Sequence, residues 1–496
     1  MATTVSDPKG ASTSVPPPIS TVDDAVSTGA RISSLFARQR ANQAAVKRTT
    51  AAERIAKLER LRAAIVAREP EIRDAMYADF KKSATEVDLT EIYPVLVDIK
   101  EAIRHLPTWM KPAKAGTPMS LFGTSSTVHY EPRGVVLIIG PWNYPFQLVI
   151  APLVAAIAAG NCAIVKPSEL TSHTSRLLGS LLGDVFNEDE VAVVEGGPVE
   201  TQQLLALPFD HFFFTGSTRV GRIVAEAAAR HLASTTLELG GKSPAIIDDS
   251  AELELTARRL VWGKFVNAGQ TCIAPDYILV SERNQQPLVD AIRKAIADLY
   301  GASEDERKAS PDLCRIINAR NFDRLEKLLA ESVAAGAKVE IGGGTDAAER
   351  YIAPTVLSNV TADHAVMSEE IFGPILPVLT YKSFDEVAPF VTARDKPLAL
   401  YVFGKDQARI SSVLSETTAG GSCVNNTLIH FVNHNLPFGG VGPSGQGSYH
   451  GFYGFKAFSH ERAVLRQGRA DMLKQVYPPY NAKVAKMIGW MRKLFT

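Results

Sequence analysis

Hydrophobic and polar positions follow a helical period in the first part of the chain. Over residues 50–81, after a threonine cap at Thr50, apolar side chains recur every three or four positions, which predicts a helix. The stripe consists of Ile55, Leu58, Leu61 and Ile65. A second helix is predicted over residues 86–106, and the Pro, Gly, Ser and Thr of residues 111–127 indicate a linker or an extended excursion between domains.

Beyond Tyr130 the pattern changes to short apolar runs that alternate with helical segments. The predicted strands cover residues 134–139, 162–165, 191–194 and 211–214, and the predicted helices cover 146–159, 172–186, 202–207 and 220–232. Regular alternation of strand and helix is typical of a parallel sheet with helices on both faces. This part of the chain therefore predicts a doubly wound, nucleotide-binding fold.

A second alternating block runs from residue 236 to about residue 423. Its predicted strands include 244–247 and 277–280, and its predicted helices cover 253–265, 286–299 and 321–335. A glycine-rich stretch follows over residues 437–447, and the sequence has no repeat of solenoid period. We therefore expect two α/β lobes that meet near Glu238.

Composition fits a protein of two or three domains without a charged macromolecular partner. Of the 496 residues, 46% are hydrophobic and 21% are charged. Basic and acidic residues number 53 each, so no net field attracts nucleic acid or an anionic membrane. The four cysteines, Cys162, Cys272, Cys314 and Cys423, lie far apart, which predicts neither a disulfide framework nor a metal site. Free thiols fit a reducing compartment, and we expect a cytoplasmic location.

Targeting and membrane signals are weak in this sequence. Residues 1–24 are rich in Ser, Thr, Pro and Ala and contain neither an apolar signal-peptide core nor an arginine, so we expect a disordered leader. No apolar run reaches the ~18 to 20 residues that span a bilayer. The nearest run, 146–159, contains Pro152 and is expected to be a buried helix.

Two motifs follow predicted strands of the first block. Gly-Pro-Trp-Asn-Tyr-Pro at 140–145 stands at the carboxyl end of a strand, where open α/β sheets bind ligands, and its Asn143 can offer an amide to a developing oxyanion. Phe-Thr-Gly-Ser-Thr-Arg-Val-Gly at 214–221 is a glycine-rich turn that opens a helix, which favours a diphosphate. Thr218 replaces the middle glycine of the G-x-G-x-x-G pattern, so a simple strand-to-helix turn is the alternative interpretation.

Two further motifs supply a carboxylate and a thiol. Glu-Leu-Gly-Gly-Lys-Ser-Pro at 238–244 places Glu238 before two glycines that let the chain pass close to a substrate. Asn-Ala-Gly-Gln-Thr-Cys at 267–272 places Cys272 in a small polar loop, whereas a buried inert cysteine such as Cys162 lies in an apolar run. The alternative interpretations are a structural thiol and a carboxylate paired with a neighbour such as Lys242.

The four motifs, in this order, resemble the aldehyde dehydrogenase superfamily, and the resemblance extends over about residues 33–479. Further matching segments are Val-Lys-Pro-Ser-Glu at 165–169, Glu-Ile-Phe-Gly-Pro at 370–374 and Leu-Pro-Phe-Gly-Gly-Val-Gly at 436–442. Segments 447–451 and 458–460 are similar to the class 3 branch, which includes fatty and aromatic aldehyde dehydrogenases such as those that act on coniferyl aldehyde.

The resemblance implies the α/β aldehyde dehydrogenase fold. A Rossmann-like, doubly wound NAD(P)-binding domain would comprise residues 25–110 and 131–237, and an α/β catalytic domain residues 238–424. A small β bridging element, residues 111–130 and 452–476, would pair across a homodimer, because exposed β excursions are an edge liability. Residues 477–496 would form a C-terminal amphipathic helix.

The resemblance also implies NAD(P)-dependent oxidation of an aldehyde to a carboxylic acid. Cys272 would attack the carbonyl as a thiolate and later carry a thioester, while Asn143 and the Cys272 N–H would hold the oxyanion. Glu238 would act as general base for the water that releases the acid. Because an ordinary thiol has a pKa near ~8.5, the surroundings of Cys272 are expected to activate it.

The cofactor residues are likewise implied by the resemblance. They are Pro141, Trp142, Lys166, Glu169, Gly216, Ser217, Thr218, Arg219, Val220, Gly221, Glu370 and Phe372. Lys166 and Glu370 resemble ribose ligands, and Phe372 resembles the contact beside the nicotinamide. Glu169 would accept ribose hydroxyls but repel a 2′-phosphate, so NAD is favoured and NADP stays possible. No metal is implied.

Several alternatives stay open at this point. A CoA-acylating dehydrogenase of the same fold is disfavoured by Glu238, because a hydrolytic base has little use when a thiol accepts the acyl group. A non-catalytic NAD-binding or structural member is less favoured still. The expected substrates are long-chain aliphatic or aromatic aldehydes. The terminal helix could pack on a subunit, cover the substrate entrance or contact a membrane surface. His450 and His460 are left outside the predicted catalytic set.

Overall fold

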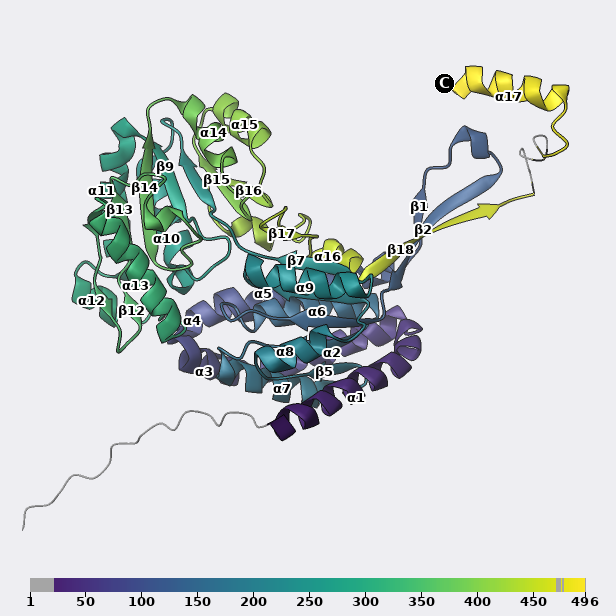
Figure 1. Cartoon of the computed structure of the whole chain (residues 1–496), viewed down its shortest axis with the longest axis horizontal. Coiled ribbons are helices and arrows are strands. Elements are labelled where there is room, and N and C mark those ends of the chain that lie inside the picture. Colours follow the sequence, from purple (N-terminus) through teal and green to yellow (C-terminus); the bar gives the residue numbers. More distant parts are fainter. Residues whose placement is uncertain (1–21, 470–473, 475–476, 496) are drawn as a thin grey trace, which may run out of the picture.

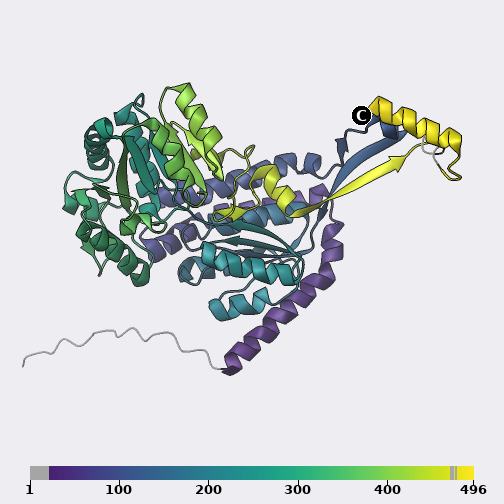
Figure 2. The same cartoon turned by 45° about the horizontal axis from the view of Figure 1, so that its top comes forward.

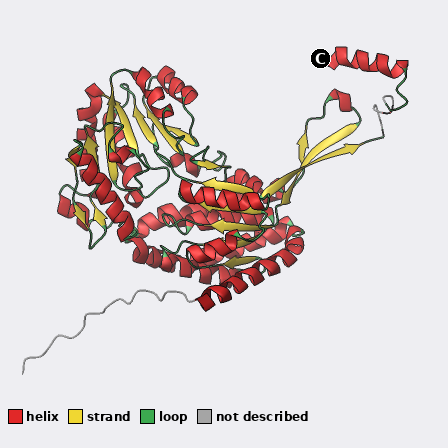
Figure 3. Ribbon diagram, viewed as in Figure 1, coloured by secondary structure: helices red, strands yellow, loops and turns green. Residues whose placement is uncertain are grey.

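The computed structural model describes residues 22–469, 474 and 477–495, and it consists of two α/β units and a projecting sheet (Figure 1). The predicted leader, 1–24, lies outside the described residues except for its last three. Those three begin α1 (Val22–Lys47), a helix that the sequence analysis did not predict. The predicted α/β class is confirmed, since two large, mainly parallel sheets are each flanked by helices (Figure 3).

The helix predicted over residues 50–81 is two helices. The first, α2 (Ala51–Ala67), begins at a capping box in which Thr50 Oγ1 accepts from the Glu53 N–H and the Glu53 carboxylate accepts from the Thr50 N–H. The second, α3 (Glu69–Phe80), has Pro70 in its first turn. Because proline has no N–H to continue the bonds of α2, the chain starts a new helix there.

The helix predicted over residues 86–106 is also interrupted. The chain forms α4 (Ala84–Val87), a π-helical turn η1 (Asp88–Ile92) and α5 (Tyr93–Trp109). The wider turn shifts the helical phase, and Glu91 within it is fully buried. An apolar period of 3.6 residues does not distinguish such a turn from a regular helix, so it was not predicted.

The first large sheet has the strand order β17-β7-β6-β3-β4-β5, and every pair is parallel except the short edge strand β17. Its strands are β3 (Val135–Ile139), β4 (Cys162–Lys166), β5 (Val191–Val193), β6 (His211–Thr215), β7 (Ser234–Glu238) and β17 (Gly445–Gln446). In β3, Val136 and Ile138 pack in one cluster with α6, and Val135 and Leu137 pack in another with α1. Both faces are buried, as the continuous apolar run requires.

Helices connect the strands of this first sheet. They are α6 (Gln147–Ala159), α7 (Ser172–Val185), α8 (Pro198–Leu205) and α9 (Thr218–Arg230). The chain moves outward from β3 through β4 to β5, and then returns to place β6 and β7 on the other side of β3. The strand order therefore reverses between β3 and β6, where sheets of this kind bind ligands at their carboxyl ends.

The second large sheet has the order β10-β13-β14-β9-β8-β15-β16, with β10 antiparallel and the other strands parallel. Its strands are β8 (Pro244–Ile247), β9 (Tyr277–Ser281), β10 (Lys338–Ile341), β13 (Thr355–Ser358), β14 (Ile375–Tyr381), β15 (Ala399–Phe403) and β16 (Gly421–Val424). The helices around it are α10 (Leu253–Phe265), α11 (Gln285–Tyr300), α12 (Glu304–Ala309), α13 (Ala319–Ala334), α14 (Val387–Thr392) and α15 (Gln407–Glu416). A two-stranded ribbon, β11 (Thr345–Asp346) and β12 (Tyr351–Ile352), is separate from it.

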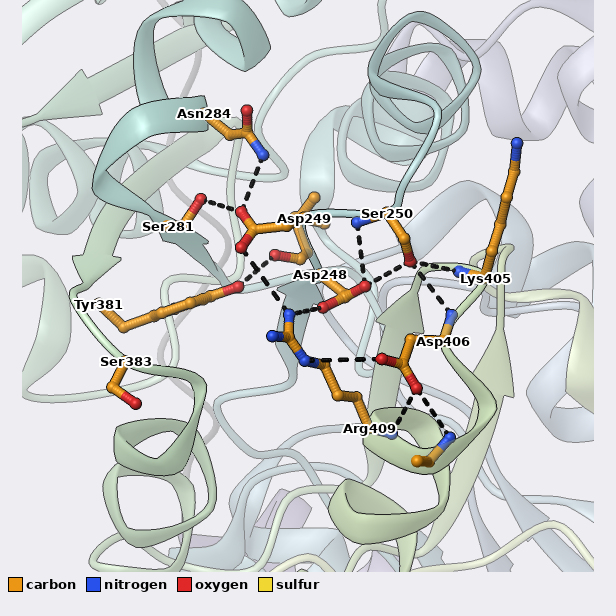
Figure 4. A network of polar contacts seen from close by, with 12 residues as sticks. Asp248, Asp249, Ser250, Ser281, Asn284, Tyr381, Ser383, Lys405, Asp406 and Arg409 are labelled. Atoms are coloured by element: carbon orange, nitrogen blue, oxygen red, sulfur yellow. Dashed lines mark hydrogen bonds and ion pairs between the residues drawn. The ribbon is translucent and has the colours of Figure 1, made fainter.

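The carboxyl ends of the second sheet are occupied by the protein's own polar groups (Figure 4). Asp248, directly after β8, pairs with Arg409 at 2.6 Å. Asp249 accepts hydrogen bonds from Ser281 and from Asn284, the latter at 3.0 Å. This network of paired groups fills the edge at which a parallel sheet would ordinarily take a ligand, so any site of this lobe must lie elsewhere.

A three-stranded antiparallel sheet, in the order β1-β2-β18, projects from the body in both views (Figures 1 and 2). It consists of β1 (Ala113–Ala115), β2 (Thr124–Pro132) and β18 (Ser459–Gln467), and the short α16 (Gly451–Ala457) directly precedes β18. Of the two interpretations of residues 111–127, the extended excursion is correct. The predicted terminal helix is present as α17 (Ala482–Phe495), near the tip of this sheet.

Candidate active site

The four motifs meet where the carboxyl ends of the first sheet face the amino ends of the second. The rings of Trp142, after β3, and Phe372, before β14, lie edge to face with their centroids 5.2 Å apart. The Asn267 side chain, in the loop before β9, donates to the Asn143 carbonyl at 2.9 Å. These contacts bring together residues that the sequence separates widely.

The loop that carries Cys272 is held in a conformation that few sequences can adopt. Asn267, Ala268 and Gly269 have φ values of 54°, 51° and 74°, in the left-handed region. A Cβ on Gly269 would lie 2.3 Å from the Gly373 carbonyl oxygen, so only glycine fits there. The Asn267 side chain also donates to the Gln270 carbonyl at 3.1 Å, which closes the turn directly before the thiol.

The surroundings of Cys272 favour the neutral thiol. Burial, Glu370 and Glu238 raise the pKa of Cys272, and the backbone N–H groups of Cys272 and Ile273 lower it by less. The charges around Cys272 therefore do not provide the expected activation of the thiol, because desolvation and two carboxylates all disfavour a thiolate. A base that removes the proton has to come from within the site.

Asn143 lies in the loop after β3, and its side chain is buried. The next residue, Tyr144, places its hydroxyl 2.6 Å from Thr271 Oγ1, directly before the cysteine. The Asn143 loop and the cysteine loop are thus joined by two hydrogen bonds, one through Asn267 and one through Tyr144. Such a connection fixes the amide relative to the thiol.

Glu238 ends β7 and is 2% exposed. Within the part of the chain that the structure describes, neither carboxylate oxygen has a hydrogen-bond partner, and burial alone raises the pKa of Glu238 well above its usual value. The alternative partner, Lys242, pairs instead with Asp276 at 2.5 Å. A buried carboxylate without a partner is costly to the fold and well suited to accept a proton.

Glu370 approaches the Glu238 segment closely. A Cβ on Gly240 would lie 1.9 Å from a Glu370 carboxylate oxygen, so the glycine permits this contact. Burial, with a smaller contribution from Asp276, raises the pKa of Glu370 to about 8. Nearby, burial lowers the pKa of Lys264 to about 8, and its Nζ lies 4.0 Å from Asp276. The carboxyl group of Glu370 and the ammonium group of Lys264 therefore have similar pKa values, and shifted pKa values of this kind are common in reactive sites.

The predicted cofactor residues lie after the carboxyl ends of β3, β4 and β6, except Glu370 and Phe372, which precede β14 of the second sheet. Ser217 is the N-cap of α9, and the first-turn N–H groups of that helix open at the point where the strand order reverses. Lys166 ends β4 and pairs with Glu169 at 2.8 Å. A helix N-terminus for phosphates together with a Lys–Glu pair for hydroxyls is a donor set that fits a dinucleotide.

Comparison with known proteins places this arrangement in a family. The model of the aldehyde dehydrogenase family matches residues 18–464. The chain belongs to the aldehyde dehydrogenase family. The 4,4'-diaponeurosporen-aldehyde dehydrogenase of Staphylococcus aureus is 47% identical over 86% of this chain and 92% of its own length. Aldehyde dehydrogenase family 3 member A2 of Mus musculus is 47% identical over 86% of this chain and 87% of its own length.

Solved structures agree with this assignment. The substrate-bound state of Staphylococcus aureus AldH superposes with a TM-score of 0.89 at 44% identity, over 93% of this chain and 99% of that chain. An aldehyde dehydrogenase of Mycobacterium tuberculosis complexed with NAD+ superposes with a TM-score of 0.81 at 26% identity, over 89% of this chain and 92% of that chain. The predicted family and its class 3 affinity are confirmed: the protein is an NAD(P)-dependent aldehyde dehydrogenase that oxidises small-molecule aldehydes.

Behind the Asn143 and Cys272 loops lies a group of charged side chains that was not predicted, of which Lys82 and Glu91 are fully buried and Glu86 is partly buried. We call Lys82, Glu86 and Glu91 the anchor cluster. Lys82 Nζ lies 3.0 Å from Glu91 Oε1, with both side chains fully buried, and 4.6 Å from the centre of the Tyr144 ring. Glu91 Oε2 accepts from the Gln147 N–H at 2.9 Å, where α6 begins.

The third member of the anchor cluster reaches the cysteine loop. Glu86 Oε1 accepts from the Asn267 N–H at 2.8 Å. The anchor cluster therefore contacts both loops: Lys82 and Glu91 hold the Asn143 loop, and Glu86 holds the cysteine loop. In the sequence, the charges of the anchor cluster have the pattern of a solvated helix face. Only their position shortly before the part of the chain that carries the motifs hinted at a role near the site.

No helix among the described residues is long and apolar enough to cross a membrane. The apolar run of residues 146–159 forms the buried helix α6, which packs in the same hydrophobic cluster as Val136 and Ile138.

Proposed function

We propose that this aldehyde dehydrogenase converts long-chain aliphatic or aromatic aldehydes to carboxylic acids through a thioester on Cys272. The observation that supports it best is Glu238, a buried carboxylate whose oxygens accept no hydrogen bond within the described chain and whose pKa burial raises. Water activated by such a base releases an acid, which is the chemistry that a thioester requires for turnover.

Cys272 acts as the nucleophile in this proposal. Its sulfur loses a proton to a base of the site and forms a bond to the aldehyde carbon, and the carbonyl oxygen becomes an oxyanion. The Asn143 amide and the Cys272 N–H donate to that oxyanion, a contribution of roughly 3 to 4 kcal/mol for one such donor. When bound, the oxidised nicotinamide supplies the hydride acceptor.

Glu238 acts in the second half of the reaction. It takes a proton from water, the oxygen of that water bonds to the thioester carbon, and the carbon–sulfur bond breaks to free the acid and the Cys272 thiol. The pair Lys166 and Glu169 and the N-terminus of α9 would hold the ribose and the diphosphate, and Glu370 and Phe372 would contact the nicotinamide end. The carboxylate of Glu169 favours NAD over NADP.

An apolar substrate is supported by the side chains around the thiol. Cys272, Trp262, Phe431 and Phe438 all pack against the same hydrophobic cluster. The relative from Staphylococcus aureus is named for a carotenoid aldehyde, a long apolar molecule. A long or aromatic aldehyde would bury its tail against such a surface, at about 25 cal/mol per Å² of apolar area.

We further propose a homodimer that pairs through the projecting sheet, the bridging element of residues 111–130 and 452–476. The sheet stands away from the body and leaves β1 and β18 as edge strands, which a second copy would cover. The division into a cofactor domain and a catalytic domain at Glu238, and the cytoplasmic location, stay predictions.

The proposal is tested by supplying the purified enzyme with a panel of aldehydes, NAD+ or NADP+, and CoA. We expect NADH formation that does not need CoA, with the carboxylic acid as product and longer or aromatic aldehydes turned over best. An acyl-CoA product and a dependence on CoA would favour the acylating alternative. No reduction of either cofactor with any aldehyde would contradict the enzymatic function.

A further inference from the structure

Two histidines and an aspartate from distant parts of the chain converge beside Tyr449 and Phe438, whose rings contact the ring of His450. Asp98 lies on α5, His434 lies after the 3-10 turn η7 (Ile429–Val432), and His450 precedes α16. Asp98 Oδ1 is 2.8 Å from His434 Nε2 and 3.4 Å from His450 Nδ1. The three ligand atoms all lie within 4.8 Å of one another.

We propose that Asp98, His434 and His450 form a binding site for a divalent transition metal of the zinc type. Two imidazole nitrogens and a carboxylate are the ligands that such ions prefer, and a fourth position would be left for water. In a tetrahedral site with bonds of about 2.0 to 2.1 Å, ligand atoms are roughly 3.3 Å apart. The 3.4 Å between Asp98 Oδ1 and His450 Nδ1 is already close to that value, and the 2.8 Å between Asp98 Oδ1 and His434 Nε2 would have to widen to admit the ion.

The aspartate has an oxygen available for the ion. Asp98 is 7% exposed, and its Oδ2 is buried with no hydrogen-bond partner within the described chain. Asp98 and His450 line a cavity of about 20 Å³ whose other walls are mostly apolar. His434 is not among the residues that line this cavity, which has room for a water molecule beside Asp98 and His450. A buried carboxylate oxygen requires some partner.

Aromatic rings hold the His450 side chain in place, and the Phe438 ring lies with its centroid 5.6 Å from that of His450. The His450 ring stacks on Tyr449, with centroids 4.1 Å apart. His450 also has φ 76° and ψ 140°, a backbone conformation that a side chain rarely adopts, and such strain often marks a ligand site.

A metal here would act as a clamp on the segment that supports Glu238. The two histidines bracket residues 435–449, and this segment contains β17, whose Gly445 pairs with Glu238 in the first sheet. Within it, the Ser444 carbonyl accepts from the Leu239 N–H at 3.1 Å. Joining both ends of the segment to α5 would restrict its motion, so we expect metal binding to raise the thermal stability of the enzyme.

Cobalt(II) and zinc(II) serve as the probes, with the full-length Cys272→Ser chain as parent so that the reactive thiol does not compete. After treatment with a chelator, the parent is expected to bind one Co2+ per subunit, with visible absorption bands of a tetrahedral site and no thiolate-to-metal band. Zn2+ is expected to displace Co2+ and to raise the melting temperature of the parent.

His434→Gln and Asp98→Asn, each in that parent, are expected to weaken the binding of Co2+ by at least about 100-fold and to remove the rise in melting temperature. His105→Gln is the matched control, since His105 lies on the same helix and pairs with Glu101 on the surface. It should bind Co2+ as the parent does. Melting curves in metal-free buffer check that each variant is folded.

Diffraction at the cobalt absorption edge provides a test that needs no ligand variant. An anomalous peak between Asp98, His434 and His450 is the expected result. The proposal is overturned if the parent binds no Co2+ saturably, if His434→Gln and Asp98→Asn bind as the parent does, or if the absorption or the anomalous peak assigns the ion to Cys314 or Cys423.

Discussion

The anchor cluster and Glu238 are two polar regions near the cysteine loop, and they differ in how fully their buried carboxylates are paired. Glu91 has Lys82 on one oxygen and the Gln147 N–H on the other. Glu238 has no hydrogen-bond partner on either oxygen within the described chain. Both carboxylates are buried, and burial raises the pKa of each.

The difference indicates separate tasks for the two regions. A buried charge with partners fixes the elements that supply those partners, so the anchor cluster sets the positions of the Asn143 and Cys272 loops. A buried carboxylate without partners is destabilising, and such a group persists where it serves chemistry. The anchor cluster therefore fixes the shape of the site, and Glu238 transfers protons.

The largest expected effect comes from the amide that the anchor cluster positions. Asn143→Ala removes one oxyanion donor, and we expect kcat to fall by about 10² to 10³-fold while NADH binding stays unchanged. Steady-state kinetics and fluorescence titration measure the two quantities. Asn187→Ala, at an exposed position, serves as the control and should keep wild-type kcat. An Asn143→Ala enzyme with normal kcat would mean that the amide has no part in the reaction.

The pairing of the anchor cluster is tested by removing one partner and then both. Lys82→Met leaves Glu91 buried without its cation, and we expect a loss of about 3 to 5 kcal/mol in the free energy of unfolding. Lys82→Met/Glu91→Gln should recover much of that loss, because the unpaired charge is gone while the amide oxygen can still accept from the Gln147 N–H. Urea unfolding measures both. Additive losses in the double variant would argue against a coupled pair.

A smaller effect is expected from the pH dependence of stability at Glu238. Because burial raises its pKa, the folded protein holds this proton more tightly than the unfolded chain, so the stability it contributes is present below the unfolded value of 4.5 and is lost as pH rises through the raised pKa. Glu238→Gln removes this loss. We expect the melting temperature of the variant to exceed that of the wild type by a margin that grows from pH 5 to pH 9, and parallel curves would contradict the assigned pKa shift.

The motifs and the sheets could be predicted because their signals are local. The predicted strands of the first sheet, β3, β4, β5 and β6, are short, largely buried apolar runs, and Asn143, Glu238 and Cys272 each lie in a compact motif beside a strand. Strand β7, with the sequence Ser-Thr-Thr-Leu-Glu, contains no such run and was not predicted. The helix α9 and its N-terminal turn were predicted within two residues, since a glycine-rich turn precedes an amphipathic stretch.

The remaining features depend on contacts between distant residues or on irregular turns. The anchor cluster joins residues 82–91 to residues 144 and 267, and no pattern along the chain records that meeting. The π turn η1 that buries Glu91 has no period of its own. The Asp98, His434 and His450 cluster spans more than half of the chain, so a search for closely spaced ligands could not find it.

Trapping the acyl group on the enzyme tests the central claim most directly. Glu238→Gln, mixed with an aldehyde and NAD+, is expected to release about one equivalent of NADH per subunit and then to stop, because the thioester forms but water is not activated. Mass spectrometry should then find the acyl group on Cys272 in the variant and not in the wild type after turnover. Continued turnover by Glu238→Gln at the wild-type rate, or an acyl group on a residue other than Cys272, would contradict the account.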